Sequence, residues 1–113
     1  MEFPEVISFD ASDDEADAAH DLIRLLADLA IREPFVVSSV HGERLARAID
    51  GRRASGTPPD VLDQAWASEV GSQAHQAGAD AVVAIGGGRV LDIGKLAAAR
   101  AGIPVIVVPT QLS

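Results

Sequence analysis

Three apolar runs stand out along the chain, at residues 35–40, 80–85 and 103–108, and each is rich in valine and isoleucine. Short runs without polar alternation are typical of strands that are covered on both faces of a parallel sheet. Residues 5–9 predict a further short strand, and a poor edge strand is expected around residues 53–55. Together these segments predict a small sheet with buried central strands.

Between the runs, apolar residues recur at helical spacing. In the segment that precedes Pro34, one face is predicted to carry Ala18, Leu22, Leu25, Leu26 and Leu29. Ser12 is expected to cap this helix through a capping box that ends at Glu15. The helix is predicted to run to about Glu33, because a proline at the next position disfavours its continuation.

Three further helices are predicted over residues 43–50, 61–76 and 89–101. Gly78 and Gly102 follow the last two and are expected to close them. Strands that alternate with helices favour a Rossmann-like α/β fold, with a parallel sheet and helices on both of its faces. The length of 113 residues allows one domain, and residues 1–113 are interpreted as a single nucleotide-binding unit.

Composition narrows the function classes. The net charge of −8 argues against a nucleic-acid partner, because binding a phosphate backbone needs a basic face. The sequence has no cysteine, which excludes disulfides and thiolate metal sites. No apolar run approaches the ~20 residues of a membrane helix, and the first residues lack the pattern of a signal peptide. A cytoplasmic protein without a membrane partner is therefore expected.

Candidate chemistry gathers where the predicted strands end. In an open parallel sheet, ligands bind beyond the carboxyl ends of the strands. Gly86, Gly87 and Gly88 follow the second apolar run and precede a helix. Without Cβ atoms the backbone approaches a phosphate closely, and the first helical turn offers unpaired N–H groups. Arg89 adds a cation there, although a glycine-rich turn is also compatible with a mere tight connection.

Other polar residues lie near this turn. Asp92 and Lys95 share a helix face, either as a surface ion pair or as groups near a ligand. Thr110 ends the last apolar run, where its hydroxyl suits either a ligand contact or a turn cap. Ser113 is a further candidate of the same kind. The three histidines do not have metal-ligand spacing.

The stretch 84–95, with its Gly-Gly-Gly-Arg and the following Asp and Lys, resembles a known signature. Together with Gly-Ile-Pro at 102–104 and Val-Pro-Thr at 108–110, it resembles the cofactor domain of the iron-containing and polyol alcohol dehydrogenases. That superfamily includes 3-dehydroquinate synthase, and the motif is most similar to that of sn-glycerol-1-phosphate dehydrogenase. The resemblance is dense over residues 80–113 and looser before them.

The resemblance implies an α/β domain that binds NAD or NADP and a C-terminal helical domain that holds a divalent metal, zinc or iron. It implies that Gly86, Gly87 and Gly88 cradle the pyrophosphate, with Arg89 as a further cofactor-binding residue at the same place. Asp92 would lie near the nicotinamide, Lys95 near the substrate, and Thr110 and Ser113 along the nucleotide cleft. The implied activity is metal-dependent oxidation or reduction of a polyol or polyol phosphate.

Two departures shape this interpretation. The metal-binding Asp and His residues of the superfamily fall beyond Ser113, so the chain is expected to lack the metal domain and to be inactive alone. A second domain, a partner subunit or self-association is expected to complete it. Residues 38–42 contain no acid for the ribose 2′-hydroxyl, which leaves NADP open.

Two alternatives remain at this point. A dehydroquinate-synthase-like cyclase is one, although Arg89 argues against it because those enzymes more often have a small residue there. A non-catalytic nucleotide-binding or assembly module is the other.

Overall fold

A computed structural model describes residues 5–10, 14–49, 51–53 and 64–110. The elements follow in the order β1 (Val6–Ser8), α1 (Glu15–Asp28), β2 (Pro34–Ser38), α2 (Glu43–Arg47), β3 (Arg52–Arg53), α3 (Gln64–Gln76), β4 (Ala81–Gly86), α4 (Gly88–Ala101) and β5 (Val105–Pro109). The strands form a five-stranded sheet in the order β1-β5-β4-β2-β3. Every pair of neighbouring strands is parallel. The predicted parallel α/β fold is confirmed.

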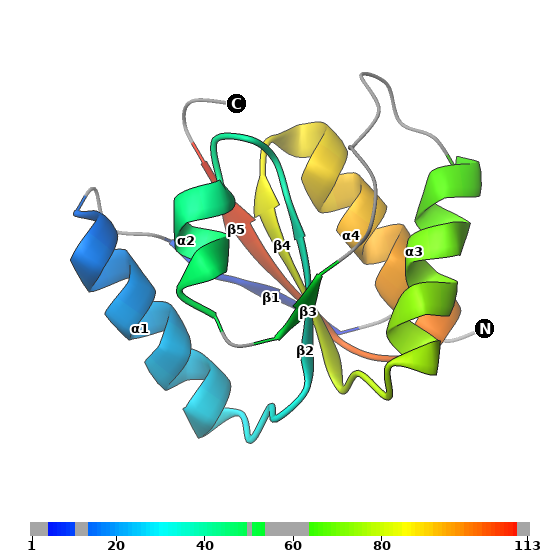
Figure 1. The fold of residues 1–113 in the computed structure, drawn as a ribbon, viewed down its shortest axis with the longest axis horizontal. Helices are drawn as coiled ribbons and strands as arrows, with labels where there is room; N and C mark the ends of the chain where they lie inside the picture. The colour runs from blue at the N-terminus through cyan, green and yellow to red at the C-terminus, as the bar shows by residue number, and fades with distance from the viewer. Residues whose placement is uncertain (1–4, 11–13, 50, 54–63, 111–113) are drawn as a thin grey trace.

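The sheet is covered on both faces, with α1 and α2 on one side and α3 and α4 on the other (Figure 1). Because successive residues of a strand point to opposite faces, neighbours in β4 belong to different cores. Val82 and Ala84 pack in the cluster that includes Val70 of α3 and Ala97 of α4. Val83 and Ile85 pack in the cluster that contains Leu22 of α1 and Ala46 of α2. This double coverage explains why the central strands are apolar throughout.

The first helix differs from its prediction at both ends. Its N-cap is Asp14, whose side chain accepts a hydrogen bond from the amide of Asp17 at 3.0 Å. The predicted cap, Ser12, lies outside the described residues. The helix ends at Asp28 rather than near Glu33, because the chain turns at Ala30, which has a φ of 58°. The amide of Ile31 donates to the carbonyl oxygen of Leu26 at 2.9 Å, which completes a Schellman-type end.

Pro34 is consequently the first residue of β2 and does not end a helix. The second helix is also shorter than predicted, ending at Arg47 rather than residue 50. The predicted edge strand exists as β3, with Arg52 opposite Phe35 in the sheet. Residues 54 and 55 of that prediction lie outside the described residues.

The predicted closing glycines are confirmed. Gly78 and Gly102 have φ values of 70° and 71°, in the left-handed region that glycine adopts without steric cost. Residues 61–63, where the third helix was predicted to begin, lie outside the described part of the chain. None of the described helices has the length and apolar character needed to cross a bilayer.

Candidate functional site

Three segments meet at the carboxyl edge of the sheet. The amide of Ser39, just after β2, donates to the carbonyl oxygen of Ile85 at 2.9 Å. The amide of Thr110, just after β5, donates to the carbonyl oxygen of Gly86 at 3.0 Å. The ends of β2 and β5 therefore flank the end of β4, as the sequence predicts for parallel strands.

The glycines of the turn have different surroundings and therefore different structural roles. Gly86 has a φ of 156°, and a Cβ there would lie 2.8 Å from Oγ of Ser39 and 3.1 Å from Cβ of Val90. Glycine is therefore required at Gly86 to pack the turn against the loop after β2. A Cβ at Gly88 would meet nothing within 4 Å. Gly88 thus leaves open space in front of the helix, which is where a ligand would approach the backbone.

The N-terminus of α4 differs from that of α1 in the charge that its own residues supply. Its N-cap is Gly87, which makes no side-chain hydrogen bond, and the first turn has no acidic residue. Arg89 lies in this turn and adds a positive charge to the positive end of the helix dipole. In contrast, α1 begins with the carboxylate of Asp14 bonded to its first turn. The amides and Arg89 at the start of α4 are suited to an anion such as a phosphate.

Arg89, Asp92 and Lys95 all lie exposed on α4. Nζ of Lys95 is 3.9 Å from Oδ1 of Asp92, and the two side chains are 46% and 56% exposed. An ion pair of this kind contributes well under ~1 kcal/mol to stability. Along the helix axis, the backbone of Lys95 lies ~10 Å from that of Gly88, at ~1.5 Å per residue. Its side chain leans back toward the helix N-terminus, as helical side chains do.

Thr110 is half-buried beside the glycine turn, and its backbone is tied to Gly86. The structure thus brings Thr110 and the start of α4 to one edge. Ser113 lies outside the described residues.

The helix that follows β2 begins with an acid, Glu43, that the sequence analysis did not single out. Oγ of Ser38 donates to Oε2 of Glu43 at 3.0 Å, so the first residue of α2 reaches back to the end of β2. Glu43 directly follows residues 38–42, which contain no acid. The signal available in the sequence was an acidic residue directly after the turn at Gly42, where a helix begins.

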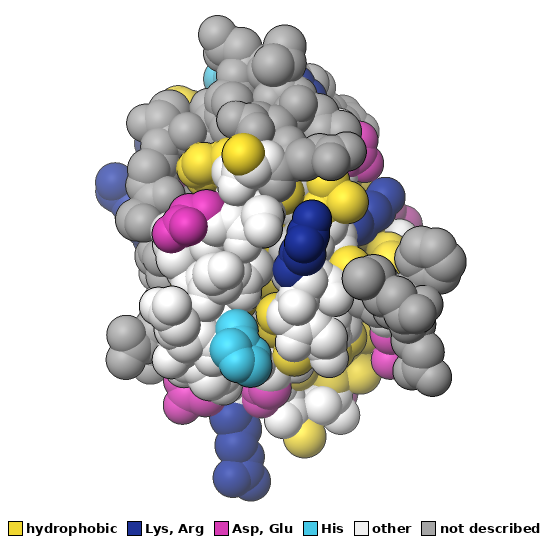
Figure 2. Space-filling view, turned by 90° about the vertical axis from the view of Figure 1, so that its right-hand side faces the viewer, with side chains coloured by type: hydrophobic (Ala, Val, Ile, Leu, Met, Phe, Trp, Pro, Cys, Tyr) yellow, Lys and Arg dark blue, Asp and Glu magenta, His cyan; other side chains and the backbone are white. Residues whose placement is uncertain are grey.

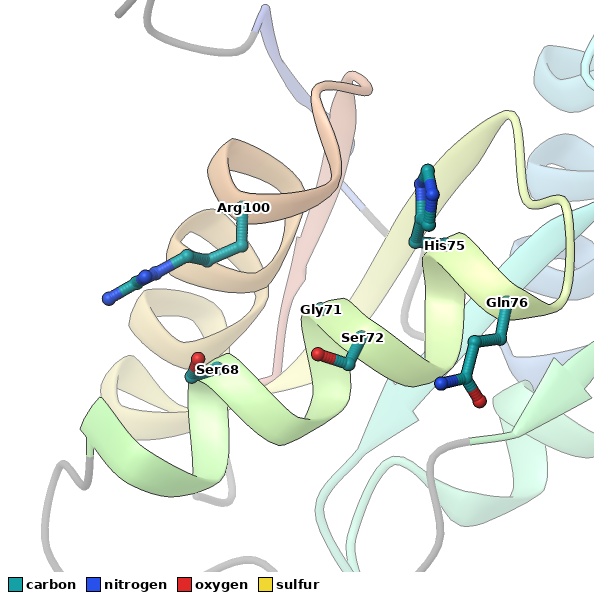
Figure 3. Close-up of a pocket in the computed structure, with 6 residues that line it drawn as sticks. All are labelled: Ser68, Gly71, Ser72, His75, Gln76 and Arg100. Carbon is teal, nitrogen blue, oxygen red and sulfur yellow. The ribbon is translucent and has the colours of Figure 1, made fainter.

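A surface hollow of about 330 Å³ lies elsewhere, along the outer side of α3 and α4. It is lined by Ser68, Gly71, Ser72, His75, Gln76 and Arg100 (Figure 3). A Cβ at Gly71 would lie 2.8 Å from Cβ of Arg100, so close helix packing explains the small residues here. This face carries mostly polar and backbone atoms with scattered charges (Figure 2). The hollow reaches Arg100, ~18 Å along α4 from Gly88 at ~1.5 Å per residue, so it is separate from the glycine turn.

A metal site does not fit the described residues. Within the described part of the chain, no three His, Cys, Asp or Glu residues are grouped to hold a metal ion.

Comparison with known proteins supports one family. A model of iron-containing alcohol dehydrogenases matches residues 15–113. The chain is 34% identical over 102 residues to a maleylacetate reductase of Burkholderia cepacia. The aligned region covers 84% of this chain and 29% of that protein. The chain thus spans less than a third of the length of this relative.

Solved structures share the fold. The maleylacetate reductase of Agrobacterium tumefaciens superimposes with a TM-score of 0.71 at 26% identity, covering 97% of this chain and 32% of that one. The sulfoacetaldehyde reductase of Bifidobacterium kashiwanohense, solved in complex with NAD⁺, gives a TM-score of 0.63 at 18% identity. That match covers 96% of this chain and 35% of the reductase.

Proposed function

The chain belongs to the iron-containing alcohol dehydrogenase family, and we propose that its glycine turn binds the pyrophosphate of a nicotinamide dinucleotide. The observation that carries this proposal is the start of α4. Gly88 leaves open space, Gly87 provides no side-chain cap, and Arg89 adds a cation. A diphosphate would accept hydrogen bonds from the first-turn amides and offset the positive charge that gathers there.

Each candidate residue has a proposed task. Gly86 holds the turn in its bend, Gly87 and Gly88 let the pyrophosphate approach the backbone, and Arg89 pairs with its charge. Thr110, which follows β5 beside the turn, contacts the nucleotide, and Ser113 is proposed to do the same. When bound, the nicotinamide accepts or donates a hydride.

The two polar residues further along α4 are proposed to act beyond the pyrophosphate. Asp92 lies toward the nicotinamide and Lys95 toward the substrate. Both are exposed on α4, within reach of a ligand that extends along it.

The proposed reaction class is a metal-dependent NAD(P)-linked reduction or oxidation at an alcohol carbon. The iron or zinc ion is assigned to residues other than those described here, since these form no metal cluster. A second domain, a partner subunit or a second copy would then complete the enzyme. The cyclase and non-catalytic alternatives remain predictions.

Two substrate classes are candidates. The Gly-Gly-Gly-Arg motif with its Asp and Lys favours a polyol or polyol phosphate such as sn-glycerol 1-phosphate. The 34% identity over 102 residues favours an unsaturated keto acid like that of maleylacetate reductase. Adding sn-glycerol 1-phosphate with NAD⁺, and maleylacetate with NADH, to lysate of cells that express the protein would separate them. With the correct pair, the nicotinamide absorbance should change faster than it does in lysate without the protein.

The binding proposal is tested by titrating the protein with NADH and NADPH while nicotinamide fluorescence is recorded. Saturable binding of at least one is expected. The substitution Gly88→Ala should weaken cofactor binding at least about tenfold, because a methyl group would enter the space next to the first-turn amides. A tenfold loss of affinity corresponds to about 1.4 kcal/mol. The stability of this variant should stay unchanged or rise by up to about 1 kcal/mol, since alanine favours helices.

Gly102→Ala is the matched control at the other end of α4. Its φ of 71° makes the substitution strained, but a Cβ there meets nothing within 4 Å. This variant should lose about 1 kcal/mol of stability and keep its NADH affinity. Absence of saturable binding of either cofactor at millimolar concentration would contradict the proposed function.

A further inference from the structure

Glu43 lies at the strand end that neighbours the glycine turn. Strands β2 and β4 are adjacent, with Ser38 opposite Ile85 in the register. Because Oε2 of Glu43 accepts from Oγ of Ser38 at 3.0 Å, the carboxylate is held at the carboxyl end of β2. In dinucleotide-binding folds, an acid at the strand end beside the phosphate-binding turn accepts from the ribose 2′-hydroxyl.

The loop that leads into Glu43 is packed firmly against β4. The amide of Gly42 donates to the carbonyl oxygen of Ser39 at 3.1 Å and lies 3.2 Å from its Oγ. A Cβ at Gly42 would lie 2.6 Å from Cγ2 of Ile85, so only glycine lets the loop approach this closely. Glu43 follows directly and its side chain is 37% exposed, which keeps it accessible to a ligand.

We propose that Glu43 makes the site favour a dinucleotide with a free ribose 2′-hydroxyl over one with a 2′-phosphate. The inference rests on the proposed dinucleotide function. A carboxylate accepts hydrogen bonds at several lone-pair positions, so it can hold Ser38 and receive a ribose hydroxyl as well. The same negative charge repels a 2′-phosphate.

Arg47, the cation next to Glu43, strengthens the preference for a free ribose 2′-hydroxyl. Nε of Arg47 is 3.5 Å from Oε1 of Glu43, and the arginine side chain is 74% exposed. An arginine near the ribose is the usual partner of a 2′-phosphate in NADP-binding folds. While Glu43 carries its charge, it competes for this guanidinium. Removing that charge would therefore end a repulsion and release a phosphate-binding group at the same time.

The test uses ADP-ribose and 2′-phospho-ADP-ribose, which share the adenosine half and lack the nicotinamide. Their dissociation constants are measured by calorimetry for the protein and for Glu43→Gln. This variant keeps the size and an acceptor oxygen for Ser38 but removes the charge. The unsubstituted protein should bind ADP-ribose more tightly than 2′-phospho-ADP-ribose. The ratio of the two dissociation constants should shift about tenfold toward the 2′-phosphate ligand in the variant.

Glu69→Gln is the matched control for total charge. Glu69 is exposed on α3, where its Oε1 accepts from Nε2 of Gln73 at 3.5 Å, so the ratio should stay unchanged. Ser38→Ala removes the hydroxyl that holds Glu43 and keeps the charge, so it should shift the ratio in the same direction but less. Thermal melting of each variant checks that it is folded.

The outcomes separate the two proposals. If Glu43→Gln and Ser38→Ala weaken both ligands equally, Glu43 merely holds the loop, and the inference is overturned while the proposed function stands. An unchanged ratio in a folded Glu43→Gln variant has the same meaning. If the protein itself binds neither ligand, the proposed function fails and the inference fails with it.

Discussion

At the scale of single residues, Asp80 joins two parts of the chain that are far apart in sequence. Its Oδ2 accepts from the amide of Arg32 at 2.7 Å, and its Oδ1 accepts from the amide of Glu33 at 3.0 Å. Its own amide donates to the carbonyl oxygen of Glu33 at 3.1 Å. The turn after α1 is thus fastened to the start of β4, which aligns β2 beside it.

Asp80→Asn should lower the free energy of unfolding by about 1–3 kcal/mol, because one carboxylate oxygen becomes an NH₂ group that faces an amide donor. Urea unfolding followed by circular dichroism measures this. Asp21→Asn is the control, since Asp21 is exposed on α1, and its effect should stay within about 0.5 kcal/mol. Equal stabilities of the two variants would show that the Asp80 bonds contribute nothing net.

At the scale of elements, α4 lies unusually close to the strand beneath it. A Cβ at Gly94 would lie only 2.5 Å from Cβ of Ala84, which is fully buried in β4. A glycine facing an alanine therefore sets the distance between helix and sheet. This distance also determines where the first turn of α4 stands relative to the end of β4, and so the shape of the candidate site.

Gly94→Ala should lower the free energy of unfolding by about 1–3 kcal/mol, although alanine is the better helix former, because the core cannot absorb the added methyl group. It should also weaken NADH binding, since α4 must shift. Lys95→Ala, at the exposed neighbouring position, should leave stability within about 0.5 kcal/mol. A Gly94→Ala variant as stable as the parent protein would show that helix and sheet adjust without cost.

At the scale of the whole molecule, cofactor binding and metal binding are expected to be separable. Backbone amides and one arginine form the proposed phosphate site, whereas the described residues contain no group that fits a metal ion. EDTA or added Fe²⁺ should therefore leave the NADH dissociation constant of the 113-residue protein unchanged within about twofold, a shift of ~0.4 kcal/mol.

Titrations with and without the chelator measure this, and Gly88→Ala provides a reference for real loss of affinity. No alcohol oxidation is expected from the protein alone with Fe²⁺ present. Loss of NADH binding on chelation would instead mean that a metal ion helps to hold the cofactor.

Much of the architecture follows from local sequence patterns. Apolar runs without alternation identify β2, β4 and β5, because strands covered on both faces have no polar side. The glycine turn could be located because it directly follows one such run. Helix ends were predictable where a glycine adopts a left-handed conformation, as at Gly102. They were not predictable at Ala30, where alanine adopts the same conformation and no residue type announces it.

The sequence by itself determined that helices alternate with buried strands and that a glycine turn precedes α4, since both are expressed within a few neighbouring residues. Only the tertiary structure decided the strand order, the hydrogen bond that Ser38 donates to Glu43, and the hydrogen bonds that the turn after α1 donates to Asp80. Hydrogen bonds of this kind depend on where the chain returns in space. A local sequence pattern cannot predict these hydrogen bonds, because they form only when separate elements pack against one sheet.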